Sequence, residues 1–121
     1  MRQREQFTGL IVEDEWLLRL ELIEELAGAG WRLNEAATGE EALALIQGGI
    51  DFLVTDIRLP GAVNGWDVAE AGRRHDPLLP VIYVSANPID PRRRVEGSLF
   101  LGKPVDMLQL LHCCDRLVLK H

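Results

Sequence analysis

Charged and hydroxyl side chains stand where short apolar runs of the sequence end. Glu13 and Asp14 close the first run, and Asp56 closes another. Ser85 closes a third run, and Lys103 follows a fourth. Carboxylates about 4 Å apart repel one another by about 4 kcal/mol per pair when the effective dielectric constant is about 20. If the fold brings these side chains together, the acidic cluster is expected to bind a cation or to retain a proton.

The same side chains suit the transfer of a phosphoryl group. Mg²⁺ prefers hard oxygen ligands, so it is the natural occupant of a carboxylate cluster. With the metal bound, Asp56 would be an ionised nucleophile, and Lys103 would neutralise charge on the incoming group. Ser85 would donate a hydrogen bond to a remaining phosphoryl oxygen. Phosphoryl transfer depends mainly on such positioning and charge stabilisation.

Apolar runs and helical patterns alternate along the whole chain. Continuous runs rich in branched residues are typical of parallel strands that helices cover on both faces. The pattern predicts an α/β fold, a doubly wound parallel sheet of five strands in which the carboxyl ends of all strands share one edge. The expected strands are the strong runs 9–14, 52–56 and 81–85 and the weaker runs 31–37 and 98–102.

Helices are predicted between these runs. Thr38 and Glu41 form a capping-box pattern that opens one helix, which Gly48-Gly49 ends. Another helix is expected over 66–74, and Asp106 is placed to cap the last one. The apolar stripe of the first helix is expected to be Leu17, Leu20, Ile23 and Ala27. That of the last is expected to be Met107, Leu110, Leu111, Cys114, Leu117 and Val118.

Composition indicates one soluble globular domain over residues 1–121, with a polar N-terminal extension at 1–6. Hydrophobic residues make up 47% of the 121 residues, and no apolar run approaches the roughly 18 residues of a membrane span. The adjacent cysteines Cys113 and Cys114 suit a reducing compartment, so a cytoplasmic location is expected. The net charge of −6 argues against direct nucleic-acid binding, because the basic cluster Arg92-Arg93-Arg94 stands alone.

The ordered combination of motifs resembles the response-regulator receiver domain of two-component signalling. The resemblance runs from LIVEDE through VTDIRLPG and VIYVSA to FLGKP and the closing helix. It implies a flavodoxin-like fold and Mg²⁺-dependent transfer of a phosphoryl group to Asp56. The donor would be a histidine kinase or a histidine phosphotransfer protein, and the domain would signal by protein-protein contact as a monomer or weak dimer.

The resemblance also implies roles for individual residues around the metal. Glu13 and Asp14 take the place of the acidic pair, with Asp14 as the direct ligand and Glu13 acting through water. Asp56 and the backbone carbonyl of Arg58 would complete the protein ligands of Mg²⁺.

The remaining implied roles concern switching between two states. Ser85 stands in the place of the switch hydroxyl, Phe100 in that of the aromatic switch and Lys103 in that of the family's lysine. The peptide before Pro104 is expected to be cis, as is typical of the family.

One stretch departs from the pattern of typical receivers. Between Ser85 and Lys103 the sequence holds Pro88 and Pro91 and no apolar helical stripe, so the fourth helix is expected to be short or replaced by a loop. Residues 87–98 are predicted to be irregular and mobile, and phosphorylation is expected to order them. The arginines at 92–94 are expected to offer a basic surface to an acidic partner or to the phosphoryl site.

Other interpretations remain open. An aspartate at a strand end is also a common turn opener or helix cap. A haloacid-dehalogenase-like phosphatase would need a second acid two residues after the nucleophile, where Arg58 stands. A pseudo-receiver that only binds partners commonly lacks an acid or the lysine, and this chain has both. The favoured interpretation is a phosphoacceptor that catalyses its own phosphorylation and slow dephosphorylation rather than a turnover enzyme, either stand-alone or part of a hybrid kinase.

Overall fold

The computed structural model describes residues 2–87 and 90–119, and five parallel strands form its sheet. The strand order is β2-β1-β3-β4-β5, which confirms the predicted doubly wound topology. β3 and β4 are buried along their whole length, as the strong apolar runs 52–56 and 81–85 predict. The strands are β1 (Thr8–Val12), β2 (Arg32–Ala36), β3 (Phe52–Asp56), β4 (Val81–Ser85) and β5 (Leu99–Gly102).

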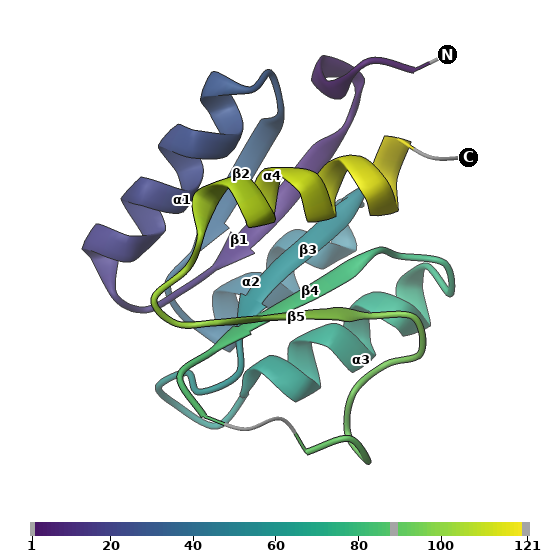
Figure 1. Cartoon of the computed structure of the whole chain (residues 1–121). Coiled ribbons are helices and arrows are strands. Elements are labelled where there is room, and N and C mark those ends of the chain that lie inside the picture. The colour runs from purple at the N-terminus through teal and green to yellow at the C-terminus, as the bar shows by residue number, and fades with distance from the viewer. Residues whose placement is uncertain (1, 88–89, 120–121) are drawn as a thin grey trace.

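Helices cover both faces of the sheet, as Figure 1 shows. On one face pack α1 (Trp16–Gly28) and α4 (Met107–Cys114), and on the other pack α2 (Gly39–Gln47) and α3 (Gly65–His75). Helix α4 continues as a turn of π-helix, Asp115–Leu119. None of these helices, within the residues described, is long and apolar enough to cross a membrane.

Local capping sets where the helices begin. The Thr38 hydroxyl accepts a hydrogen bond from the Glu41 amide at 3.1 Å, and the Glu41 carboxylate accepts one from the Thr38 amide at 3.2 Å, which confirms the predicted capping box. The Asp106 carboxylate accepts from the Gln109 amide at 3.2 Å and caps α4 as predicted. The end of α2 at Gln47, just before Gly48, also agrees with the sequence.

Of the predicted apolar stripe of α1, only Ile23 packs against the core, and the other three residues are exposed. Leu17 and Leu20 are 51% and 44% exposed, whereas Leu22 and Leu26 are fully buried against the sheet and Leu18 is half-buried. Leucines occupy more than one face of this helix, so the spacing alone did not decide which face packs inward. The helix instead packs through residues spaced four apart, and it turns Leu17 and Leu20 to the solvent.

The two ends of the described chain meet. Arg4, in a short 3₁₀ turn (Arg4–Gln6), donates to both carboxylate oxygens of Asp115 at 2.9 and 2.8 Å. The same guanidinium reaches the carbonyl of Ala29 at 3.4 Å. The predicted polar extension is therefore attached to the end of α4 and to the turn after α1.

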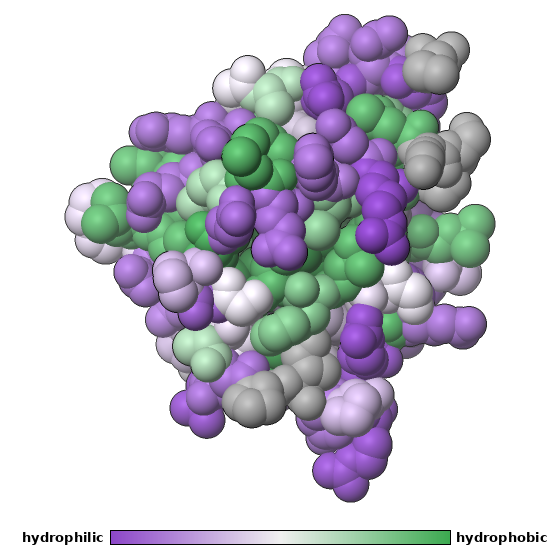
Figure 2. All heavy atoms as spheres, in the orientation of Figure 1, coloured by the Kyte–Doolittle hydropathy of each residue, from purple (hydrophilic) through white to green (hydrophobic). Residues whose placement is uncertain are grey.

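The β4–β5 connection holds no helix among its described residues, which form bends, turns and irregular segments. This confirms the predicted replacement of the fourth helix by a loop, although Pro88 lies outside the described residues. Figure 2, drawn in the orientation of Figure 1, shows hydrophobic residues gathered across the middle of the visible face, over β5. Phe100 of this edge strand is 37% exposed.

Side chains attach this connection to the rest of the fold. The guanidinium of Arg93 donates to Asp67 at 3.2 Å and to Glu70 at 2.9 and 3.1 Å, both on α3. Arg94 donates to the carbonyl and the hydroxyl of Ser98. Arg92 pairs with Asp90, so all three arginines of the expected basic surface have partners within the domain, and their role toward an acidic partner or the phosphoryl site stays a prediction.

Candidate functional site

The carboxyl ends of the strands bring distant acidic residues together. Val12 lies opposite Thr55 in the sheet register, so the turn after β1 lies beside the end of β3. One carboxylate oxygen from each of Glu13, Asp14 and Asp56 lies within 4.8 Å of the others. Glu13 and Asp56 are buried, whereas Asp14 is exposed. The structure therefore assembles the acidic cluster that the sequence predicts.

Lys103 reaches into this cluster from the end of β5. Its Nζ lies 2.8 Å from Oδ2 of Asp56 and 3.0 Å from Oε1 of Glu13. Its backbone amide donates to the carbonyl of Ser85 at 3.0 Å, and the peptide that joins it to Pro104 is cis. Burial lowers the pKa of the ammonium, but its interactions with the carboxylates of Asp56 and Glu13 outweigh burial and raise the pKa above the usual lysine value.

Glu13 is the most strongly perturbed carboxyl group of the site. Burial raises the pKa of Glu13 to about 7, and the hydrogen bond from the Glu15 amide and the nearby ammonium of Lys103 only partly oppose this rise. Its Oε1 makes no hydrogen bond of acceptable geometry with any described residue, although Lys103 Nζ lies close enough for an ion pair. A buried oxygen in this position has unused capacity to accept a ligand or a proton.

Asp56 is held from both sides. Lys103 approaches Oδ2, and the Arg58 amide donates to Oδ1 at 3.3 Å. Behind it, a side chain at Gly65 would have no room, because a Cβ atom there would lie 1.9 Å from the carbonyl oxygen of Asp56. The sequence pattern does not reveal this contact, because it joins the end of β3 to the first residue of α3.

The two predicted switch residues lie outside the hydrogen-bonded cluster. The Ser85 hydroxyl is buried at the end of β4 and accepts a hydrogen bond from the Asn87 amide at 3.1 Å. Phe100 lies next to Tyr83 in the register of β4 and β5, partly open to solvent. Tyr83, which the sequence analysis did not single out, is buried and accepts from the Val95 amide at 3.1 Å.

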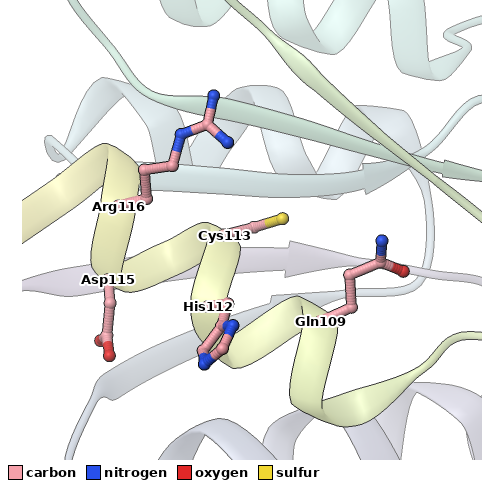
Figure 3. Close-up of a pocket in the computed structure, with 5 residues that line it drawn as sticks. All are labelled: Gln109, His112, Cys113, Asp115 and Arg116. Carbon is pink, nitrogen blue, oxygen red and sulfur yellow. The ribbon is translucent and has the colours of Figure 1, made fainter.

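The surface has one hollow beside the site and another away from it. One lies beside it, between α1 and the turn into α4, and is lined by Glu15, Leu18, Glu21, Lys103, Pro104, Val105 and Met107. The other follows α4 and the start of its π-helical continuation (Figure 3), where His112 and Asp115 point to one side of the helix and Cys113 and Arg116 to the other. The hollow on α4 shares no residue with the acidic cluster, so it is not part of this site.

Comparison with known proteins gives one consistent likeness. The family model of the response regulator receiver domain matches residues 10–114. The sensor kinase CckA of Brucella abortus is 32% identical over 110 residues, which make up 85% of this chain and 12% of that kinase. The chain therefore spans a small part of that relative.

Solved structures show the same likeness. A response regulator receiver protein from Sinorhizobium medicae is 31% identical, with a TM-score of 0.90 over 94% of this chain and 95% of that one. The receiver domain of the hybrid histidine kinase CckA is also 31% identical, with a TM-score of 0.80 over 92% of this chain and 98% of that one.

Proposed function

This chain belongs to the response regulator receiver family of two-component signalling, and on that premise we propose that Asp56 is the residue that accepts the phosphoryl group. One observation carries the proposal: Asp56 ends a central strand with Lys103 Nζ at 2.8 Å and with two further carboxylates in the same cluster. An ordinary turn-opening aspartate would not need a buried position between an ammonium and other acids.

The donor set fits a hard divalent cation. Three carboxylate oxygens from different residues converge, and the buried Oε1 of Glu13 lacks a hydrogen bond from the described residues. We propose that Asp14, Asp56 and the backbone carbonyl of Arg58 hold Mg²⁺ directly and that Glu13 acts through water. When bound, Mg²⁺ supplies positive charge that stabilises the oxygens of the transferred group.

The side chains of the domain then perform the transfer. A carboxylate oxygen of Asp56 forms a bond to phosphorus while the bond from phosphorus to the donor's imidazole nitrogen breaks, and the released imidazole takes up a proton. Lys103 is already in contact with Asp56 and neutralises charge on one side. Ser85 can donate its hydroxyl hydrogen to the phosphoryl group while its oxygen still accepts from the Asn87 amide, so movement of Ser85 toward that group would carry the start of the β4–β5 connection with it.

An exposed apolar surface beside the site supports a protein donor. Trp16, Leu17 and Leu20 of α1 are 66%, 51% and 44% exposed, directly after the acidic turn. Large exposed apolar groups next to a reactive centre indicate a docking surface. We propose that a histidine kinase or a histidine phosphotransfer protein docks there, in the cytoplasm, and delivers its phosphohistidine to Asp56. Net negative charge favours output through protein contacts over contacts with nucleic acid.

The deciding experiment incubates the chain with Mg²⁺ and acetyl phosphate and follows intact mass. The expected result is one added phosphoryl group that is lost in base, absent from Asp56→Asn and from a sample with chelator. A domain that only binds partners would gain no group, and a phosphatase would release phosphate rapidly over many turnovers without accumulating the adduct. Either of these outcomes would contradict the proposal, as would an adduct of wild-type yield on Asp56→Asn.

A further inference from the structure

We propose that Arg19 is a positioning residue that fixes the acidic turn 13–15 and so aims Asp14 at the cation. The inference rests on the proposed function, because it concerns the same cluster. Arg19 lies in the first turns of α1 and is 18% exposed at its side chain. It belongs to neither the acidic cluster nor the set of residues that the sequence motifs single out.

Two hydrogen bonds define the role of Arg19. Its Nη1 donates to the backbone carbonyl of Glu13 at 2.7 Å, and its Nε donates to Oε1 of Glu35 at 2.9 Å. Glu35 belongs to β2, the strand next to β1. The guanidinium thus connects the end of β1, through one rigid planar group, to the neighbouring edge strand.

The acidic turn needs such support because the regular ladder ends there. The Glu13 amide donates to the carbonyl of Ala36 at 3.0 Å, which is the last contact between the backbones of β1 and β2. Beyond it the carbonyl of Glu13 is bound by Arg19, and the Glu15 amide folds back onto Oε2 of Glu13 at 3.1 Å. Both backbone groups of Glu13 are therefore fixed, and Asp14 follows directly.

The charge of Arg19 and its geometry predict opposite effects on cation binding. A guanidinium near the cluster repels Mg²⁺, so its removal would tighten binding if charge alone mattered. If its hydrogen bonds position the turn, removal would weaken binding. Outer-shell partners that orient metal ligands typically contribute about 10-fold or more to metal affinity. The ion pair with Glu35 is exposed on the carboxylate side and contributes little by itself.

The test compares Arg19→Met, Arg19→Lys and Arg74→Met by Mg²⁺ titration of tryptophan fluorescence. Arg19→Met is expected to raise the Kd for Mg²⁺ about 10-fold. Arg19→Lys keeps the charge and one donor and is expected to recover part of that loss. Arg74 is exposed and has no recorded hydrogen bond or ion pair within the described part of the chain, so Arg74→Met should leave the Kd unchanged.

A second readout needs no metal at all. Exchange of the Glu15 amide hydrogen in metal-free protein should become faster in Arg19→Met, because the turn is loosened, and should stay as in the wild type in Arg74→Met. An unchanged or lower Kd for Mg²⁺ in both Arg19 variants, or unchanged exchange at Glu15, would overturn the inference. If Arg19→Met does not fold, Arg19→Lys alone decides by the same two measurements.

Failure of the inference about Arg19 can be told apart from failure of the proposed function. If wild-type protein gains no phosphoryl group from acetyl phosphate, the phosphoacceptor proposal fails, yet the Mg²⁺ titration still judges Arg19. If the wild type is phosphorylated and Arg19→Met binds Mg²⁺ as tightly as the wild type, only the inference about Arg19 fails.

Discussion

Two connections leave neighbouring strands at the same edge of the sheet, and they are held in different ways. The connection after β3 is fixed by backbone contacts, since the Gly65 amide donates to the Ile57 carbonyl at 2.8 Å and Asn64 caps α3 in a box with Asp67. The connection after β4 is held by side-chain contacts, among them the ion pairs from its own Arg93 to Asp67 and Glu70 of α3.

The difference in attachment implies a difference in stability. A helix cap contributes about 1 kcal/mol, and close packing around a buried backbone adds to it. The ion pairs of Arg93 join side chains that are 37 to 40% exposed, and such pairs contribute about 0 to 1 kcal/mol each. A new charge at Asp56 is therefore expected to leave the first connection in place and to rearrange the second.

The largest effect is expected at Gly65, at the end of the connection after β3. In Gly65→Ala the new Cβ would lie 1.9 Å from the Asp56 carbonyl oxygen, so backbone must move. We expect the free energy of unfolding to fall by about 3 kcal/mol in urea denaturation, with reduced phosphoryl acceptance. Gly28→Ala is the matched control, because a Cβ there meets nothing within 4 Å and should be neutral or slightly stabilising. Equal effects of the two substitutions would contradict the close contact.

A smaller effect is expected from Glu13, in the acidic turn after β1 that lies beside the connection after β3. Its pKa rises from 4.5 to about 7 on folding, so the folded state binds more protons between these values. Metal-free protein should therefore lose stability, on the order of 2 kcal/mol, as the pH rises from about 4.5 to about 7. Saturating Mg²⁺ favours the ionised carboxylate and should remove this loss. Thermal unfolding across this pH range measures it, and a loss of the same size in Glu13→Gln would rule out Glu13 as its source.

The smallest effect on global stability is expected at Arg93, in the connection after β4. Arg93→Met should change the free energy of unfolding by no more than about 1 kcal/mol. Hydrogen exchange of residues 90–98 should nevertheless become faster, because their attachment to α3 is lost. Arg92 is 89% exposed at its side chain and pairs only with Asp90 among the described residues, so Arg92→Met is the control. Equal exchange in both variants would show that Arg93 does not hold the connection.

Much of the fold follows from local sequence pattern. β3 and β4 were predicted with their observed bounds because strands buried on both faces leave uninterrupted apolar runs. The capping residues Thr38 and Asp106 act within one turn, so their patterns are also readable in the sequence. The acidic cluster was predictable because the topology places all strand ends at one edge.

What escaped prediction depends on contacts between distant segments. The inward face of α1 was misassigned because leucines lie on several of its faces, and only packing against the sheet distinguishes Leu22 from Leu20. Arg93 resembled a solvated basic residue until the structure placed Asp67 beside it. Arg19 carries no motif, because its partners are a backbone carbonyl and a residue of another strand.

The contact between Arg4 and Asp115 has a mechanical consequence. It places both ends of the described chain at the amino edge of the sheet, and Figure 1 shows them on the same side. The acidic turn lies at the opposite, carboxyl edge. Any polypeptide joined to either end would therefore begin on the side of the domain opposite the acidic turn. Such a polypeptide would leave the domain at the edge away from the acidic turn and would not obstruct a donor that approaches Asp56.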